Sequence, residues 1–183
     1  MSPYHLLDTA VTRKSLQLAI QLYDLAWKIG IPLLRTNVRL KEGYDQRKLD
    51  SPLPRADVWI QAASGGEAYL AETLIRHFRP TEPVRILVTT NTLQGMEIIQ
   101  NAVSAAADGN PTVSLYCAYA PFDRPKLMAR AVDQVAPKLV VLLETEIWPG
   151  LLHALKNAKK AVYIVNGRMT EKSLSRYRRF PAI

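Results

Sequence analysis

Strand and helix signals alternate five times between residues 56 and 183, and this alternation constrains the fold most strongly. The expected strands are residues 57–63, 84–90, 112–117, 138–143 and 161–166. An expected helix follows each of them, at 67–78, 95–107, 125–136, 148–158 and 170–179. Repeated strand–helix units with short connections favour right-handed crossovers. The pattern therefore predicts an α/β domain built on a Rossmann-like, doubly wound parallel sheet.

The apolar runs support a buried sheet. Leu139 to Leu143 are five consecutive apolar residues, which is typical of a parallel strand covered by helices on both faces. The chain has 183 residues, 48% of them hydrophobic, which is enough for one such domain with a core. Neither a G-x-G-x-x-G fingerprint nor a P-loop occurs, so no dinucleotide or ATP site is indicated.

Residues 15–29 predict an N-terminal amphipathic helix with a wide apolar face. Its polar residues form one narrow stripe, namely Gln17, Gln21, Asp24 and Lys28. Such a face must be buried, but the charged residues interrupt it short of the ~20 apolar residues that a bilayer requires. Two interpretations are open: a helix lying at a membrane interface, with Trp27 as an anchor, or a helix packed on its own domain or on a partner.

Residues 35–55 are basic and rich in turn-forming residues, so we expect a solvated connector that can touch anionic head groups. The sequence therefore divides into two parts. Residues 1–55 hold the amphipathic helix and the basic connector, and residues 56–183 hold the Rossmann-like domain.

Charge and cysteine content narrow the functional classes. The net charge of +8 and the pI of about 9.7 favour anionic partners such as phosphates or an acidic membrane surface. No signature of an RRM, KH or helix-turn-helix domain is present, so nucleic acid is not an expected partner. The single cysteine, Cys117, fits a reducing compartment. The histidines lack the spacing of metal ligands, and we expect neither a metal nor a cofactor.

Polar residues gather where the expected strands end, and ligands of open α/β sheets bind at that edge. The candidate residues at these strand exits are Ser64, Gly65, Gly66, Glu67, Thr89, Thr90, Asn91, Glu144, Glu146, Asn166 and Arg168. Glu67 can act there as a general base, and the two glycines before it let a substrate approach the backbone closely.

Structural interpretations compete with these functional ones. Ser64 to Glu67 has the S-x-x-E form of a capping box. Glu144 and Glu146 point to one face if the backbone is extended there. Glu144 is then either an active-site group or the partner of a basic residue such as Arg168, and Glu146 fits the first turn of the next helix. Asn166 and Arg168 can bind phosphate or sugar hydroxyls, or stabilise their own loop.

The third strand exit carries a different signal. Asp123-Arg124-Pro125 is typical of a helix cap followed by proline at the first helical position.

Taken in order, the five strand exits resemble motifs of the Kdo (3-deoxy-D-manno-octulosonic acid) transferase family. Ser64–Glu67 is similar to the family's Ser-Val-Gly-Glu, and Thr89–Gly95 to its Thr-Thr-Thr-Pro-Thr-Gly with one residue more. Pro121–Pro125 resembles Pro-Tyr-Asp-Leu-Pro, Glu144–Gly150 resembles Glu-Thr-Glu-Leu-Trp-Pro-Asn, and Asn166–Thr170 resembles Asn-Ala-Arg-Leu-Ser. Each motif is weak alone, but five in order are specific.

The resemblance implies one half of a GT-B glycosyltransferase that is inverting and independent of metal. Glu67 matches the family's general base, and Glu144 matches its transition-state stabiliser. The implied acceptor is a lipid A precursor, and the implied donor is CMP-Kdo, bound by a C-terminal domain that these 183 residues do not hold. We therefore expect the chain alone to show no turnover.

The same resemblance implies a role in lipopolysaccharide synthesis at the cytoplasmic face of the bacterial inner membrane, with the chain peripheral or anchored by its N-terminal helix. The alternative is a non-catalytic, membrane-associated α/β module that binds lipid phosphates or a partner protein.

Overall fold

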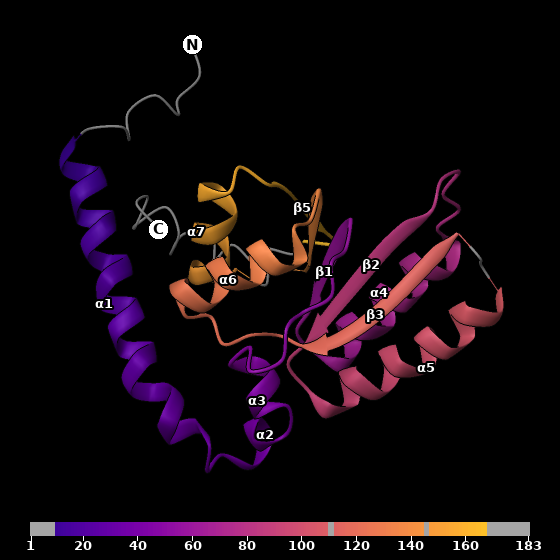
Figure 1. Ribbon diagram of the computed structural model, residues 1–183, viewed down its shortest axis with the longest axis horizontal. Coiled ribbons are helices and arrows are strands. Elements are labelled where there is room, and N and C mark those ends of the chain that lie inside the picture. Colours follow the sequence, from indigo (N-terminus) through magenta and orange to yellow (C-terminus); the bar gives the residue numbers. More distant parts are fainter. Residues whose placement is uncertain (1–9, 110–111, 145–146, 168–183) are drawn as a thin grey trace.

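Five parallel strands form one sheet in the computed structural model, in the order β3-β2-β1-β4-β5 (Figure 1). The structure describes residues 10–109, 112–144 and 147–167. The strands are β1 Val58–Ala62, β2 Val84–Thr90, β3 Val113–Tyr119, β4 Leu139–Leu143 and β5 Ala161–Val165. This order reverses direction between β1 and β4, as in a doubly wound sheet. The predicted Rossmann-like fold is confirmed.

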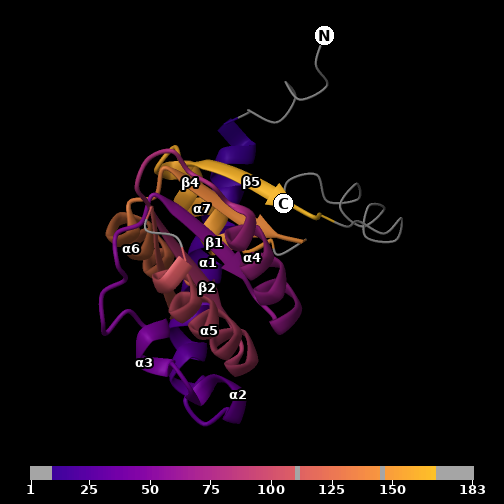
Figure 2. The ribbon, with the colours of Figure 1, turned by 90° about the vertical axis from the view of Figure 1, so that its right-hand side faces the viewer.

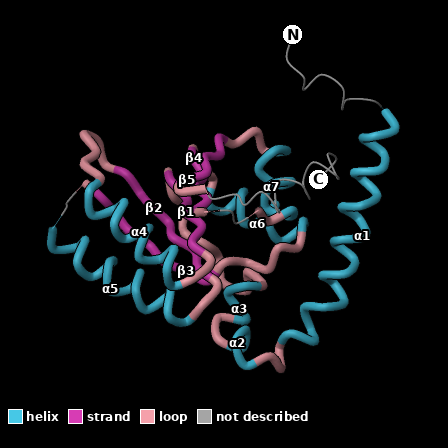
Figure 3. The backbone as a smooth tube through the Cα atoms, turned by 180° about the vertical axis from the view of Figure 1, so that it is seen from behind, coloured by secondary structure: helices cyan, strands magenta, loops and turns pink. Residues whose placement is uncertain are grey.

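Helices cover both faces of the sheet. Helices α4 (Gly65–His77) and α5 (Leu93–Gly109) lie on one face, and α6 (Pro125–Val135) and α7 (Pro149–Asn157) lie on the other (Figures 1 and 3). The crossovers through α4 and α5 build the sheet from β1 towards β3. Helix α6 then returns the chain from β3 to β4 on the other side of β1, and α7 leads from β4 to β5. The expected helix at 170–179 lies outside the described residues.

Alternation along the strands divides the apolar core into two layers. Trp59 is fully buried and belongs to the cluster on the side of α6 and α7, together with Val132 and Leu155. Its neighbour Ile60 belongs to the cluster on the side of α4 and α5, together with Ile99. Successive residues of a strand point to opposite faces, so both faces of the sheet are apolar, as the continuous runs predicted.

Helix α1 (Ala10–Leu34) forms a further layer outside α6 and α7 (Figure 1). It is longer than the predicted 15–29 and continues through Pro32. Packing explains the extension, because Ile31 is buried in the core cluster and Trp27 and Leu34 pack against that cluster. No helix among the described residues is long and apolar enough to cross a membrane.

The segment after α1 is only in part the solvated connector that its composition predicted. It forms two short helices, α2 (Val38–Lys41) and α3 (Tyr44–Arg47), which lie below the sheet in Figure 2. Leu49 and Leu53 are buried in the core cluster, and Arg47 is only 2% exposed. Arg35, Lys41 and Arg55 are exposed, whereas the apolar residues between the basic ones pack the segment onto the core.

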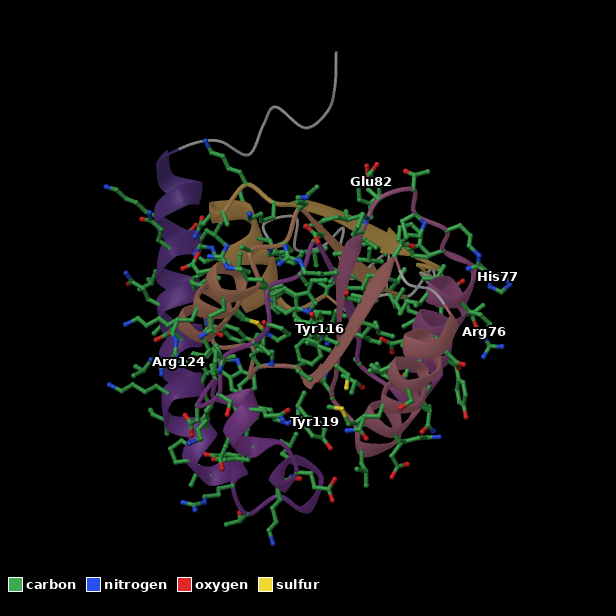
Figure 4. The ribbon with its side chains drawn as sticks, turned by 45° about the vertical axis from the view of Figure 1, so that its right-hand side comes forward. Arg76, His77, Glu82, Tyr116, Tyr119 and Arg124 are labelled. Atoms are coloured by element: carbon green, nitrogen blue, oxygen red, sulfur yellow. The ribbon has the colours of Figure 1, made fainter. Side chains whose placement is uncertain are left out.

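Polar contacts tie α1 to the domain. The Tyr23 hydroxyl donates to Asp123 Oδ2 at 2.9 Å. Arg124 donates to both carboxylate oxygens of Asp24, from Nε at 3.0 Å and from Nη2 at 3.1 Å. Figure 4 shows Arg124 beside α1. Burial, and secondarily the charge of Asp123, raises the pKa of Tyr23 to about 12.

Asp123 corrects one expectation, because it caps α7 rather than α6. Its carboxylate accepts hydrogen bonds from the Gly150 and Leu151 N–H groups, each at 2.8 Å. The residue that precedes α6 is Arg124, which makes no side-chain capping bond, while Pro125 does begin the helix. A Cβ on Gly150 would lie 2.2 Å from the Asp123 carbonyl oxygen, so this close approach requires glycine.

Candidate active site at the switch point

The exits of β1 and β4 lie side by side at the point where the strand order reverses. The two strands pair in parallel from Val58 with Leu139 to Gln61 with Leu142. Glu67 follows β1 by five residues, and Glu144 follows β4 directly. The ligand crevice of a doubly wound sheet lies outside the carboxyl ends of the strands at this point. The fold therefore brings the two predicted carboxylates to the same edge.

Glu67 is held by the loop that precedes it. Ser64 is the N-cap of α4, and its Oγ accepts a hydrogen bond from the Glu67 N–H at 3.3 Å. The Ser64 hydroxyl donates to Glu67 Oε1 at 2.9 Å, and the Ala63 N–H donates to Oε2 at 2.7 Å. The capping bond from the Glu67 N–H to Ser64 is thus present, and the backbone N–H that the Glu67 carboxylate accepts from is that of Ala63. Glu67 is only 4% exposed.

Burial also changes the acidity of Glu67. Desolvation raises the pKa of this carboxyl because it disfavours the charged form. The hydrogen bonds from Ala63 and Ser64 act in the opposite direction, and the negative charge of Glu144 adds to the increase.

Glu144 departs from the extended backbone that the sequence predicted. Its φ is 56°, in the left-handed region, which is unusual for a residue with a side chain. Its N–H donates to the Val165 carbonyl at 2.9 Å, which holds the turn against the end of β5. Glu144 is half-buried. The expected shared face with Glu146 involves a residue outside the described ones.

The two glycines have different surroundings. A Cβ on Gly65 would lie 2.8 Å from Oε1 and Cδ of Gln94, so the Gln94 side chain occupies the space beside this glycine. Gly66 faces open space apart from the Ser64 hydroxyl. Gln94, which the sequence did not single out, therefore lies over the first turn of α4.

Thr89 and Thr90 are buried at the end of β2. The Thr89 hydroxyl accepts from Trp59 Nε1 at 2.7 Å and donates to Gln61 Oε1 at 2.6 Å, within the core. Thr90 Oγ1 has no hydrogen-bond partner among the described residues, and a Cβ on Gly95 would lie 2.2 Å from it. The contacts of Thr89 are structural, and substrate binding by either residue stays a prediction.

Asn91 connects the candidate site to a residue that the sequence did not single out. Its N–H donates to the Ala63 carbonyl at 3.3 Å, and the N–H of the same alanine donates to Glu67. Its backbone carbonyl accepts from Arg47 Nη2 at 2.9 Å. The basic residues at 35–55 look alike in sequence. Only the apolar neighbours of Arg47, such as Leu49, indicate that this segment packs inwards.

The fifth strand exit is described only in part. Asn166 is exposed and has a φ of 56°, while Arg168 and Glu146 lie outside the described residues. The predicted pairing of Glu144 with Arg168 is therefore untested. Among the residues that the structure describes, no cluster of three His, Cys, Asp or Glu side chains could hold a metal ion.

Comparisons with known proteins identify the family of the chain. Residues 34–183 match the family model described as 3-deoxy-D-manno-octulosonic-acid transferase (kdotransferase). A 3-deoxy-D-manno-octulosonic acid transferase of Haemophilus influenzae is 34% identical over 149 residues, covering 81% of this chain and 33% of the relative. A bifunctional glycosyltransferase/methyltransferase of Fusobacterium nucleatum is 29% identical over 168 residues, covering 86% of this chain and 24% of the relative.

The chain also matches a plant protein. The probable mitochondrial 3-deoxy-D-manno-octulosonic acid transferase of Arabidopsis thaliana is 30% identical over 125 residues, covering 68% of this chain and 26% of the relative. No solved structure matches the chain. The chain spans about a quarter to a third of the length of these three relatives. The family model covers most of its residues, and the chain therefore belongs to the Kdo transferase family.

Proposed function

We propose that this chain is the acceptor-binding half of an enzyme that transfers Kdo from CMP-Kdo to a lipid A precursor in lipopolysaccharide synthesis. One observation carries the proposal: Glu67 and Glu144 follow the paired strands β1 and β4 at the switch point of the sheet, and burial raises the pKa of Glu67. A raised pKa makes a carboxylate a stronger base, which favours transfer of a proton to it during the reaction.

The proposed reaction is a single inverting displacement. A glucosamine hydroxyl of the acceptor gives its proton to Glu67 while its oxygen attacks the anomeric carbon of Kdo. The bond from that carbon to the phosphate oxygen of CMP breaks, and CMP leaves with the electron pair. The phosphate stabilises this charge itself, so the step requires neither a protein acid nor a metal. The negative charge of Glu144 stabilises the positive charge that develops on the sugar.

Access to Glu67 is the structural requirement of this mechanism. Each carboxylate oxygen accepts one hydrogen bond, from Ala63 or from Ser64, and retains a further lone pair. The acceptor hydroxyl must therefore enter beside the Ser64 hydroxyl or displace it. The exposed Gly66, with open space around it, is the place where the backbone leaves room for this approach.

The donor would bind elsewhere. The described residues hold one Rossmann-like sheet, and the matched relatives are three to four times longer than the matched segment. We propose that a second Rossmann-like domain binds CMP-Kdo and closes over the acceptor edge, and that the 183 residues alone have no turnover.

We further propose that α1 places the enzyme on the cytoplasmic face of the inner membrane as a peripheral protein. Its inner side packs on the domain, whereas five large apolar residues on its other side are more than half exposed. We call these residues the outer stripe: Leu18, Leu22, Leu25, Ile29 and Leu33. Exposed basic residues accompany it, namely Lys14, Lys28 and Arg35. Apolar side chains flanked by basic ones suit an anionic lipid interface.

The decisive experiment uses the protein extended by its downstream domain. Glu67→Gln should lower the rate of CMP release with a lipid A precursor by roughly 10²–10⁴-fold, the usual contribution of a general base. Glu72→Gln on the same helix, which removes a surface ion pair with Arg76, is the matched control and should keep the rate. A Glu67→Gln enzyme with nearly normal rate would show that the base is misassigned.

The second candidate function is the non-catalytic, membrane-associated module that binds lipid phosphates or a partner protein. The enclosure of Glu67 by Ser64 and Ala63 favours it, since these contacts suffice to explain the residue as a helix cap. The same assay separates the two candidates, because a module without activity releases no CMP when its downstream domain and both substrates are present.

A further inference from the structure

Arg47 is a buried cation without an anionic partner among the described residues. It is 2% exposed, and none of the ion pairs found in the described part of the chain includes it. A buried charge is costly unless it is paired or extensively hydrogen-bonded. Arg47 is extensively hydrogen-bonded, and all the oxygens to which its guanidinium donates are neutral. The guanidinium also lies 4.7 Å from the centroid of the Tyr119 ring.

One of these oxygens is the Glu42 carbonyl between α2 and α3, 3.5 Å from Arg47 Nε. The others belong to two neighbouring strand exits. Arg47 Nη1 donates to the Ala120 carbonyl at 3.3 Å, after β3, and to Asn91 Oδ1 at 3.4 Å, after β2. Nη2 donates to the Asn91 backbone carbonyl at 2.9 Å. Figure 4 shows Tyr119, the residue before Ala120, at the end of the sheet that faces the short helices. One side chain from α3 thus joins both exits at the substrate edge.

The contact with Asn91 Oδ1 determines what the amide can offer a ligand. A side-chain amide has one acceptor oxygen and one donor NH₂ group. Because Oδ1 faces the Arg47 guanidinium, the NH₂ group lies on the opposite side of the amide. Asn91 is half-buried rather than enclosed, and its backbone N–H is bonded to Ala63, next to the group that holds Glu67. The residue that carries this donor is therefore bonded to Ala63, whose N–H donates to Glu67.

We infer that Arg47 positions Asn91 so that its amide NH₂ binds an anionic oxygen, as in a phosphate carried by the acceptor sugar. This inference rests on the proposed function for the identity of the acceptor. The uncompensated charge of Arg47 supports the anionic class, because its field favours negative over neutral oxygens at the same spot. Arg47 is a positioning residue in this account, and Asn91 makes the contact with the ligand.

The first test measures binding to the 183-residue chain by NMR, with glucosamine 1-phosphate as the probe. The side-chain NH₂ resonances of Asn91, assigned by their loss in Asn91→Ala, should shift on titration, and uncharged glucosamine derivatives should shift them less. Asn91→Ala and Arg47→Gln should each weaken binding about tenfold, and the double variant should be no weaker than the weaker single one. If the loss of affinity in the double variant equals the product of the two single losses, Arg47 does not act through Asn91.

Two variants separate positioning from folding. Arg130→Gln also removes an arginine that donates to a backbone carbonyl, that of Leu49 at 3.0 Å, and should leave binding unchanged. Asn91→Asp should keep the fold, since Arg47 can pair with the new carboxylate, yet weaken binding at least tenfold because the donor is lost. If Asn91→Asp binds the probe as well as the wild type, the inference is wrong even where Arg47→Gln does not fold.

The extended enzyme distinguishes this inference from the proposed function. Phosphosugar binding that depends on Asn91 and Arg47, without CMP release by the extended wild-type protein, would support the inference and refute the transferase. CMP release with an acceptor KM that is unchanged in Asn91→Ala and Asn91→Asp would support the transferase and refute the inference.

Discussion

Residue 67 combines a structural and a chemical property in one carboxylate. Its hydrogen bonds to Ser64 and Ala63 complete the start of α4, and its burial raises its pKa. A cap alone favours the ionised form, whereas burial disfavours it. The pKa of Glu67 is raised, so the effect of burial is larger than that of the capping bonds. Ionisation of Glu67 is therefore less favourable in the folded protein than it would be in an exposed cap.

This charge predicts how stability depends on pH. Below the ordinary carboxyl pKa of about 4.3, Glu67 is neutral in both the folded and the unfolded protein. As the pH rises, the unfolded state ionises first, so the folded state loses relative stability until the pH exceeds its own raised pKa. In thermal unfolding, the midpoint temperature of Glu67→Gln relative to that of the wild type should therefore increase as the pH is raised from 4 to neutral.

A matched variant makes this comparison specific. Glu72→Gln removes a carboxylate from the surface of the same helix, where it pairs with Arg76, and should not gain on the wild type as the pH rises. A constant difference between Glu67→Gln and the wild type at all pH values would contradict the burial argument.

The site was only partly predictable from its residues. The S-x-x-E spacing predicted the cap at Ser64, and the strand-exit rule brought Glu67 and Glu144 to one edge. Arg47 could not be found this way, because its role depends on carbonyls that follow β2 and β3, far away in sequence. The left-handed backbone of Glu144 was missed for a similar reason, since its N–H bonds to the end of β5.

At the scale of elements, α1 is attached to the domain by side chains as well as by apolar packing. The contacts of Asp24 with Arg124, and of Tyr23 with Asp123, join it to the loop before α6. Trp27 also packs against Phe122 of this loop, with ring centroids 5.9 Å apart. These contacts orient the helix, so that one side faces the domain and the outer stripe faces away.

The Asp24–Arg124 pair yields a prediction of opposite sign to that of Glu67. Hydrogen bonds from Arg124 lower the pKa of Asp24, so its contribution is present above the unfolded pKa of about 3.9 and is lost as the pH falls through the folded value. Asp24→Asn should lower the free energy of unfolding by about 1–3 kcal/mol at pH 7. This loss should shrink below pH 4 in chemical denaturation, and a loss that persists undiminished would contradict the ion-pair account.

Elements with regular apolar spacing were predicted best. The strands lie within two residues of their expected bounds, because continuous apolar runs mark parallel strands. Two elements differed because contacts distant in sequence override local signals. Burial of Ile31 carries α1 through Gly30 and Pro32, and burial of Leu49 and Leu53 draws the basic segment onto the core. Asp123 precedes α6 but caps α7, which depends on the tertiary arrangement of the two helices.

For the molecule as a whole, the substrate edge and α1 are connected through the short helices. The C-terminal end of α1 leads into α2 and α3, which lie at the end of the sheet where β2 and β3 finish (Figure 1). Arg47 links α3 to that edge. In the proposed function, this connection joins the helix that contacts the membrane to the edge of the sheet that binds the lipid acceptor.

The outer stripe is the test of this arrangement. A buried Leu side chain contributes about 1.5–3 kcal/mol, so Leu22→Glu with Ile29→Glu should weaken binding to anionic phosphatidylglycerol vesicles at least tenfold in sedimentation. Both positions face away from the core, so the fold should persist by circular dichroism. Tyr69→Glu, at a position on α4 that is 56% exposed, controls for added charge and should bind as the wild type does. Equal sedimentation of all three proteins would exclude α1 as the membrane contact, because two buried carboxylates in a lipid interface cannot be neutral in energy.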